Sequence, residues 1–393
     1  MVWLQRCHPG LLAASLLLTG FGIVVVYSAS AVVAMERHDG PYFFLRRQGL
    51  FAVLGVVVMV VAMQVDYQHL QKWACWGLLA TVFCLILVYV PAFAKEAGGA
   101  RRWLQIGRWS FQPAEVAKLT LILYLAHRLT VIQQWRGPLR SQYLALGAVI
   151  GLVFGLTLMQ PDLGTAMLLV GIAAIMLFVG GVPMRYLLAS GLVLLPLLSL
   201  MLLGVGFRWR RLVAFWDPWA LRSDAGFQIV QSLLAFGKGG LTGVGPGAGK
   251  QKLFFLPEAH TDFVFAVIGE EFGFIGCLFV LSLFGVLLWS GFALAWRTPD
   301  PFARQVASGI TSMILLQAIM NVAVVVGFLP TKGLPLPFVS LGGSSLVVML
   351  ASVGLLLGIS ARTRRPQPVR HAGIDAYTMD WRVGRKETTK DSR

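Results

Sequence analysis

The chain has 393 residues, of which 57% are hydrophobic and only 13% charged, and its mean hydropathy is +0.75. A soluble domain is about one quarter charged and slightly less than half apolar, so the composition excludes an ordinary soluble globular protein. Charge-poor stretches long enough to cross about 30 Å of hydrocarbon recur along almost the whole chain, which predicts many membrane helices rather than one anchor.

The predicted fold class is therefore an all-α polytopic membrane protein with about ten transmembrane helices. We expect spans near residues 11–33, 48–65, 73–94, 112–131, 143–159, 163–182, 186–207, 266–296, 305–329 and 343–361. The first span is too long for the apolar part of a signal peptide, so no cleavable leader is predicted. Residues 1–10 are expected to be a cytoplasmic N-terminus, 11–361 a ten-helix membrane domain, and 362–393 a basic, disordered cytoplasmic tail.

The orientation in the membrane follows from the basic residues. The tail from Arg362 onward is rich in arginine and lysine, so the positive-inside rule places it, and with an even number of spans the N-terminus too, in the cytoplasm. This orientation leaves a large basic excess on the outer side: Arg37, Arg46, Arg47, Lys95, Arg101, Arg102, Arg108, Arg208, Arg210, Arg211, Arg222, Lys238, Lys250, Lys252 and Lys332. Either the orientation is inverted, or the outer face binds something anionic.

Three ionisable residues lie within or between predicted spans, where charges are costly. Glu115 and Lys118 are three residues apart on one helix face and can pair. Asp162, at the junction of two closely spaced spans, is expected to reach the same ammonium group. The cluster is either a structural ion group that locks helices or the wall of a substrate cavity, and the two interpretations are compatible.

Residues 208–261 are predicted to form the one large extracytoplasmic loop. Its segment Gly243–Lys250 resembles a phosphate-binding loop, but Val244 and Gln251 stand where the motif requires Gly and Ser or Thr. We expect either a hinge whose backbone amides, with Lys250 and Lys252, contact an anion, or a plain turn.

The segment from Leu256 to Asp262 (Leu-Pro-Glu-Ala-His-Thr-Asp) ends this loop where an apolar span begins, and Glu270 and Glu271 follow. A carboxylate at such a dry boundary has its charged form disfavoured and can act as a general base for an alcohol. Asp262 could instead merely cap the following helix, but a cap does not explain Glu258 and His260.

The segment from Leu329 to Pro337 contains three prolines near the membrane and leads into Gly342-Gly-Ser-Ser345. Because it cannot form a continuous helix, we expect a broken or re-entrant segment that is buried in protein or lines a cavity, with Lys332 at the mouth. The alternative is a structural turn with an incidental lysine.

Several of these motifs resemble the SEDS family (shape, elongation, division and sporulation). The resemblance covers residues 101–345 and rests on Gln112-Pro-Ala-Glu-Val-Ala-Lys118, Gln160-Pro-Asp-Leu-Gly-Thr165, Leu256–Asp262, Gly269-Glu-Glu271, Leu329–Gly333 and Gly342–Ser345. The Pro-Thr-Lys form and the complete Pro-Glu-Ala-His-Thr-Asp string favour the cell-division branch over the elongation branch. Leu341 and the Gly249-Lys250 pair depart from the family pattern.

The resemblance implies a ten-helix peptidoglycan glycosyltransferase that polymerises lipid II at the outer face of the cytoplasmic membrane, at the division septum, and releases undecaprenyl diphosphate. It implies a class B penicillin-binding protein transpeptidase and other divisome membrane proteins as partners, and no nucleic acid. The rival hypotheses are a lipid II flippase, which often shows internal repeats that this sequence lacks, and a non-catalytic scaffold.

The resemblance also implies roles for particular residues. The catalytic carboxylate falls on Asp262, and the family's ion cluster falls on Glu115, Lys118 and Asp162. The expected substrate-binding residues are Arg47, Arg102, Arg108, Lys332, Lys250, Lys252, Glu258 and His260. The resemblance allows a divalent cation, Mg²⁺ or Mn²⁺, but no dedicated ligand set is evident, and no organic cofactor is expected. Cys7, Cys75, Cys84 and Cys277 lack metal-ligand spacing.

Overall fold

The computed structural model describes residues 8–37, 40–97, 100–107, 109–135, 139–203, 211, 213–224, 226–253 and 256–363. The predicted basic tail beyond Thr363 lies outside the described residues. The elements are α1 (Pro9–Arg37), α2 (Phe43–Gln64), α3 (Tyr67–Leu87), β1 (Ala94–Ala97), β2 (Ala100–Ile106), β3 (Trp109–Phe111), α4 (Pro113–Gln134), α5 (Leu139–Met159), α6 (Leu163–Val179), α7 (Met184–Leu203), α9 (Phe227–Gly239), α10 (Val264–Glu271), α11 (Gly273–Arg297), α12 (Pro301–Val325) and α13 (Gly343–Thr363).

Local sequence fixes where several helices begin. Asp300 caps α12 by accepting a hydrogen bond from the backbone N–H of Ala303 at 2.8 Å, and Pro301 occupies the first turn. Asp66 caps α3 in the same way through Gln68. Pro113 opens α4, where a missing N–H costs nothing.

The helices account for the predicted membrane spans. By length and composition, seven helices in the described part of the chain could cross a membrane: α1, α2, α3, α5, α11, α12 and α13. The apolar helix α6 is shorter, and α4 is long enough but carries the buried Glu115 and Lys118. One expectation was wrong: the single span predicted at 266–296 is two helices, because the chain turns at Gly273 with φ +65°.

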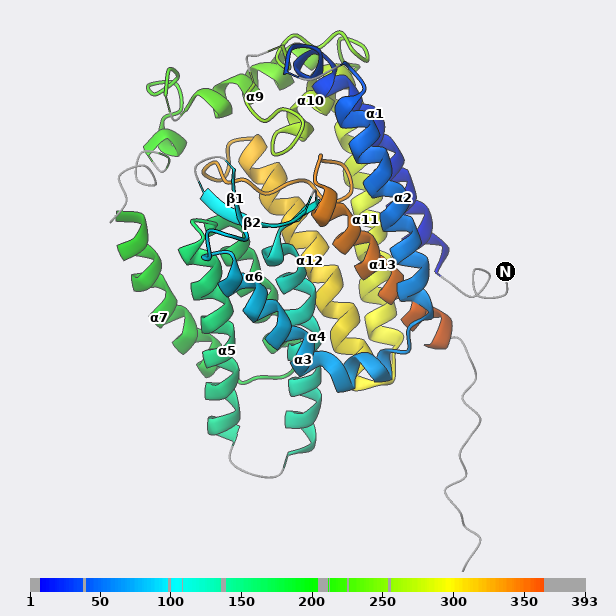
Figure 1. The fold of residues 1–393 in the computed structure, drawn as a ribbon, viewed down its shortest axis with the longest axis vertical. Coiled ribbons are helices and arrows are strands. Elements are labelled where there is room, and N and C mark those ends of the chain that lie inside the picture. Colours follow the sequence, from blue (N-terminus) through cyan, green and yellow to red (C-terminus); the bar gives the residue numbers. More distant parts are fainter. Residues whose placement is uncertain are drawn as a thin grey trace, which may run out of the picture.

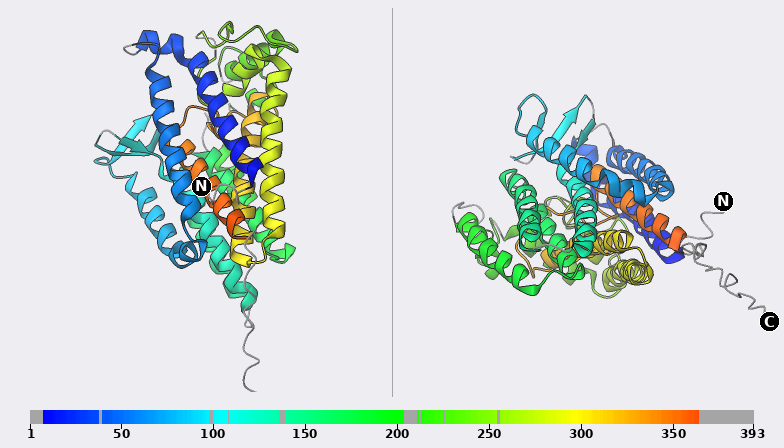
Figure 2. Two further views of the ribbon diagram at one scale, coloured as in Figure 1. Left: turned by 90° about the vertical axis from the view of Figure 1, so that its right-hand side faces the viewer. Right: turned by 90° about the horizontal axis from the view of Figure 1, so that it is seen from below.

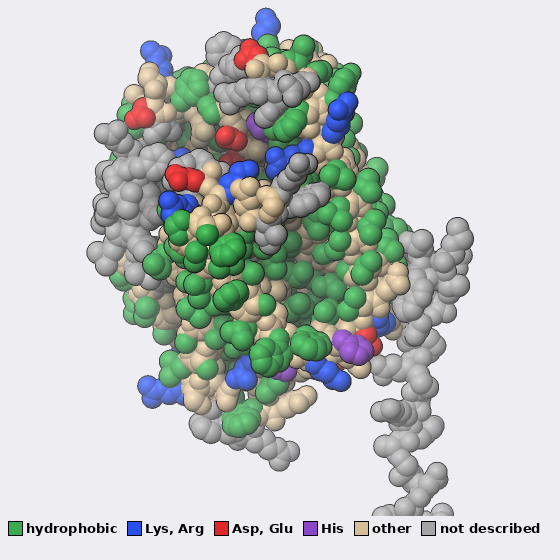
Figure 3. Space-filling view, viewed as in Figure 1, with side chains coloured by type: hydrophobic (Ala, Val, Ile, Leu, Met, Phe, Trp, Pro, Cys, Tyr) green, Lys and Arg blue, Asp and Glu red, His purple; other side chains and the backbone are tan. Residues whose placement is uncertain are grey.

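The helices form one bundle, in which α1 begins and α13 ends at the same end while α9 and α10 lie at the other (Figure 1). Helices α2 and α13 pack closely through glycines. A Cβ at Gly55 would lie 2.5 Å from Leu350, and one at Gly354 would lie 2.3 Å from the carbonyl oxygen of Met59. Hydrophobic side chains cover the middle of the face shown in Figure 3, with charged side chains above and below them.

A small antiparallel sheet, ordered β1-β2-β3, lies at the edge of the bundle between α3 and α4 (Figure 2). The sequence did not predict it, because its strands are too short for a clear alternation of polar and apolar residues. The register shifts between Lys95, which pairs with Trp103, and Glu96, which pairs with Arg101. Arg102 is the extra residue of this β-bulge, and a bulge re-aims the side chain it carries.

The segment between α12 and α13 is not helical and is buried in protein, which confirms the predicted broken segment. Leu334, Leu336 and Phe338 are almost fully buried. The segment packs against α1 at Gly22, where a Cβ would lie 2.6 Å from the Cα of Val339. Only a glycine permits so close an approach.

Candidate active site

Asp262 is positioned by a compact turn just before α10. Glu258 adopts a left-handed conformation with φ +56°, and its carbonyl oxygen accepts hydrogen bonds from the N–H groups of Thr261 at 3.1 Å and Phe263 at 3.3 Å. The Thr261 hydroxyl donates to Glu258 Oε2 at 2.9 Å. Glu258 therefore shapes the turn. Phe263 and not Asp262 is the N-cap residue of α10, and among the described residues no capping bond comes from a side chain at that position.

The surroundings of Asp262 favour a proton acceptor. Burial raises the pKa of its carboxyl to about 7, with Glu258 and Asp162 adding to the rise and Arg102 and Arg211 opposing it. A carboxylate with this pKa is poised between its charged and neutral forms at neutral pH. The backbone at Gly333 lies directly against it, since a Cβ there would be 3.1 Å from Asp262 Oδ2.

Two arginines lie close enough to Asp262 to influence it electrostatically. Arg102 leaves the β2 bulge to donate to the carbonyl oxygens of Gln160 at 3.1 Å and Pro161 at 2.6 Å. Arg211 donates to the carbonyl oxygen of Thr331 at 3.2 Å. The sequence prediction included Arg102 but not Arg211, which was counted only among the basic residues of the long loop.

Lys332 is a third cation in this region, on the segment whose Gly333 backbone lies against Asp262. Its Nζ lies 3.0 Å from Met167 Sδ on α6, and a thioether is only a weak acceptor. Within the described residues no carboxylate lies at ion-pair distance from this ammonium, and burial lowers the pKa of Lys332. A cation in this position has unused capacity to bind an anion.

The ion cluster of Glu115, Lys118 and Asp162 is arranged differently from the prediction. The predicted pair is confirmed, because Lys118 Nζ lies 2.7 Å from Glu115 Oε2 and both side chains are buried. Lys118 also donates to Gln317 Oε1 at 2.7 Å. The expected contact between Lys118 and Asp162 is wrong. Asp162 caps α6, accepting from the N–H and hydroxyl of Thr165 at 3.1 and 2.9 Å.

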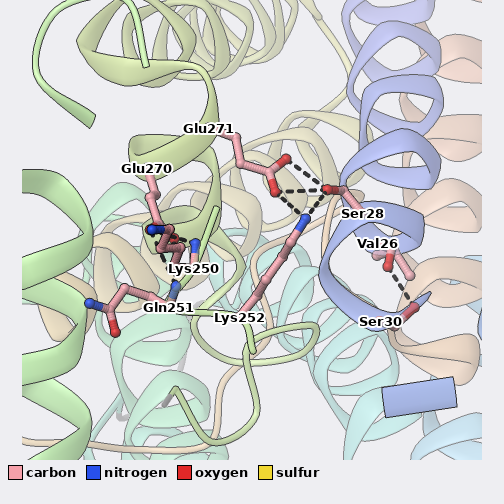
Figure 4. A network of polar contacts seen from close by, with 8 residues as sticks. All are labelled: Val26, Ser28, Ser30, Lys250, Gln251, Lys252, Glu270 and Glu271. Carbon is pink, nitrogen blue, oxygen red and sulfur yellow. Dashed lines mark hydrogen bonds and ion pairs between the residues drawn. The ribbon is translucent and has the colours of Figure 1, made fainter. Parts of the chain in front are cut away.

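The Gly-Glu-Glu carboxylates hold the end of the long loop (Figure 4). Glu271 pairs with Lys252 at 2.5 Å, and Ser28 on α1 donates to Glu271 at 2.7 and 2.8 Å while accepting from Lys252. Glu270 accepts from the backbone N–H groups of Lys250 and Gln251.

This network corrects the predicted anion contact at the glycine-rich segment. The ammonium of Lys252 is buried and already used by Glu271, and the backbone amides that would bind an anion are used by Glu270. The alternative of a plain turn fits better, because the protein supplies its own carboxylates there. The Lys250 side chain is exposed.

The remaining predicted residues lie at the margin of the site or beyond the described part. His260 packs on Phe44 of α2 with ring centroids 5.0 Å apart, and its carbonyl oxygen accepts from the N–H of Leu341. Arg47 is exposed in the first turns of α2. Arg108 lies outside the described residues.

The described residues contain no group of three or more His, Cys, Asp or Glu side chains that could hold a metal ion by themselves. A cation shared with substrate phosphates needs only one or two protein carboxylates. Glu258, near Asp262, is the acidic residue of the site that could contribute one.

Two buried amides were missed at the sequence level. Gln317 and Asn321 lie on α12, 0% and 2% exposed, and both contact the segment that carries Lys332. The available signal was their spacing of four residues in the otherwise apolar stretch 313–325, which puts both on one helix face.

Comparison with known proteins agrees with this arrangement. Residues 10–365 match the FtsW/RodA/SpoVE family model, described as cell cycle protein. The chain is 46% identical over 354 residues to a protein of Geobacter sp. (strain M18) named probable peptidoglycan glycosyltransferase FtsW, covering 90% of this chain and 96% of that protein. It is 42% identical over 365 residues to stage V sporulation protein E of Bacillus subtilis, covering 92% and 99%.

Solved structures show the same fold. A chain from work titled as the structural coordination of polymerization and crosslinking by a peptidoglycan synthase complex superposes with a TM-score of 0.76 at 32% identity, covering 91% of this chain and 99% of that chain. The rod shape determining protein RodA of Thermus thermophilus superposes with a TM-score of 0.67 at 31% identity, covering 91% and 98%. With most of its length matched in sequence and in fold, this multi-pass membrane protein belongs to the FtsW/RodA/SpoVE family of cell cycle proteins.

Proposed function

We propose that this chain is a peptidoglycan glycosyltransferase that polymerises lipid II into glycan strands during septal cell-wall synthesis. The observation that carries the proposal is Asp262, whose pKa is raised to about 7, with Arg102 and Arg211 near it. The carboxylate-free ammonium of Lys332 is on the adjoining segment, whose backbone lies against Asp262 at Gly333. A proton acceptor beside a set of cations is what transfer from a lipid diphosphate requires. Relatives named as peptidoglycan glycosyltransferases support the same activity.

In the proposed reaction, Asp262 accepts the proton of the acceptor disaccharide's 4-hydroxyl while that oxygen attacks the anomeric carbon of the lipid-linked donor. The new glycosidic bond forms as the bond from the anomeric carbon to the diphosphate oxygen breaks, and the electron pair leaves with undecaprenyl diphosphate. Lys332 and the arginines offset the negative charge that develops on the leaving group. General-base action of this kind contributes roughly 10²- to 10⁴-fold.

A divalent cation, Mg²⁺ or Mn²⁺, remains part of the proposal. Glu258, whose charge lies near Asp262, would hold it together with the diphosphate oxygens of the substrate, which leaves Asp262 free to accept the proton. Its charge would add to that of the basic residues.

We further propose that both termini are cytoplasmic and that the site opens at the outer face of the inner membrane, at the division septum. The shared end of α1 and α13 supports one side for both termini (Figure 1), and the basic composition of the segment after Thr363 supports the cytoplasm. A class B penicillin-binding protein transpeptidase and other divisome membrane proteins are the proposed partners, supported by the similarity to a chain of a peptidoglycan synthase complex.

The test is polymerisation of purified lipid II by the purified protein with its partner transpeptidase. We expect glycan strands from the wild type. Asp262→Asn should lower the polymerisation rate roughly 10²- to 10⁴-fold, and its thermal stability should equal or exceed that of the wild type. Near-normal synthesis by Asp262→Asn would remove the residue from the mechanism. Transport of lipid II across proteoliposomes without strand synthesis would instead favour a flippase.

A further inference from the structure

Two amide side chains of α12 reach the site without a role in the chemistry above. Gln317 Nε2 donates to the carbonyl oxygen of Pro335 at 2.9 Å. Asn321 Nδ2, one turn further on, donates to the carbonyl oxygens of Leu334 at 2.7 Å and Asp262 at 2.8 Å. Both side chains are buried, so these bonds form away from water, where an unmade bond is costly.

Asn321 joins two segments that are far apart in sequence. One ends in Asp262, and the other carries Lys332 two residues before its bonded carbonyl at Leu334. The two segments also touch directly, because the backbone at Gly333 lies against Asp262 Oδ2. A single amide nitrogen therefore ties the backbone that carries the carboxylate to the backbone segment that carries the ammonium.

The buried Lys118 sets the orientation of the neighbouring Gln317 amide. Lys118 can only donate, so the oxygen of Gln317 must face it and the NH₂ group must face Pro335. Glu115 in turn holds Lys118 at 2.7 Å. The buried ion pair thus supports the amides from the interior of the bundle, and the amides support the loop.

We propose that Asn321 is a positioning residue, which sets the gap between the proton acceptor Asp262 and the anion-binding Lys332. The inference rests on the proposed glycosyl transfer, and Asn321 itself touches neither substrate. Displacement of a reacting group by about 1 Å costs about 10²-fold in rate. Loss of the Asn321 bonds should therefore lower kcat much more than it raises KM.

The experiment compares Asn321→Ala and Asn321→Asp with the wild type in lipid II polymerisation, over a range of lipid II concentrations and pH. The aspartate is nearly the same size but, when ionised, cannot donate to either carbonyl. Ser312→Ala is the matched control. This serine is fully buried on the same helix, and its hydroxyl has no hydrogen-bond partner among the described residues.

We expect both Asn321 variants to lose about 10- to 100-fold in kcat, with KM within about threefold and with Ser312→Ala close to wild type. The acid limb of the pH profile should also move to lower pH, because a loosened turn lets water reach Asp262, and burial is the main cause of its raised pKa.

A second set of outcomes would overturn the inference. If activity falls only in proportion to the folded fraction and the pH profile stays in place, Asn321 is merely structural. If Asn321→Ala does not fold, full activity of Asn321→Asp would likewise show that Asn321 is not a positioning residue. A wild-type protein that makes no strands would refute the proposed function, whereas an active wild type, an inactive Asp262→Asn and unaffected Asn321 variants would refute this inference alone.

Discussion

The buried Glu115–Lys118 pair offers a sharp test of how the bundle is held together. Lys118→Met would leave Glu115 with an uncompensated charge in a position that is 3% exposed, and would leave Gln317 Oε1 without its donor. Glu115→Gln would leave the ammonium of Lys118 without a counter-charge, with only neutral amide oxygens as acceptors. Glu115→Gln combined with Lys118→Met removes both charges and leaves only the amide bond unmade.

The magnitudes follow from this arrangement. Breaking a buried ion pair costs about 3 to 5 kcal/mol. An unfolding entropy of about 2.1 cal/mol/K per residue gives about 0.8 kcal/mol/K for a chain of 393 residues, so each single variant should lower Tm by about 4 to 6 °C. The double variant should lose only the Gln317 bond, about 1 to 3 kcal/mol, or about 1 to 4 °C.

The assay is thermal unfolding in matched detergent, followed by the fluorescence of the 12 tryptophans. Lys250→Met, at an exposed lysine, is the control and should stay within about 0.5 kcal/mol of the wild type. If the losses of the two single variants simply add in the double variant, the pair does not interact and the description of the ion cluster is wrong.

Three further predictions concern the site and the long loop. Strand synthesis should rise with pH through a midpoint near 7, since only ionised Asp262 accepts a proton. The folded protein keeps the Asp262 carboxyl protonated above the ordinary carboxyl pKa of about 4, so the contribution of this residue to stability falls as pH rises from about 4 to 7. Asp262→Asn should abolish both pH dependences. Lys332→Ala should reduce the initial polymerisation rate strongly at matched salt, whereas Arg382→Ala should leave it almost unchanged. Equal small losses of rate that vanish with added salt would mean that the basic residues act only through long-range attraction to the membrane surface. Lys252→Met should lower Tm, and Glu271→Gln added to it should restore part of the loss, because the two form a buried pair; a double variant no more stable than Lys252→Met would contradict that pairing.

Much of the fold could be predicted from the sequence because it depends on local properties. Hydropathy over a span-length window identifies membrane helices, and every predicted span coincides with a helix or, at 266–296, with two. The break at Gly273 needed the structure, since a glycine in an apolar run also occurs in continuous helices. The pair of Glu115 and Lys118 was predictable because three residues separate neighbours on a helix face.

The candidate site, too, could be predicted from the sequence only in part. The turn from Leu256 to Asp262 is a continuous stretch of polar residues at the edge of an apolar span, so the sequence alone directs attention to it. The shape of the turn was not predictable, because it depends on the left-handed Glu258.

Only the tertiary structure decided which distant groups meet. Asp162 caps its own helix instead of reaching Lys118, and Lys252 is buried against Glu271 instead of facing a ligand. Arg102 reaches the site from an unpredicted bulge, and Asn321 joins two loops from near the C-terminal end of α12. The physical reason is that a charged or amide group bonds to whatever the packing of other segments brings within about 3 Å, and no local pattern in the sequence records that distance.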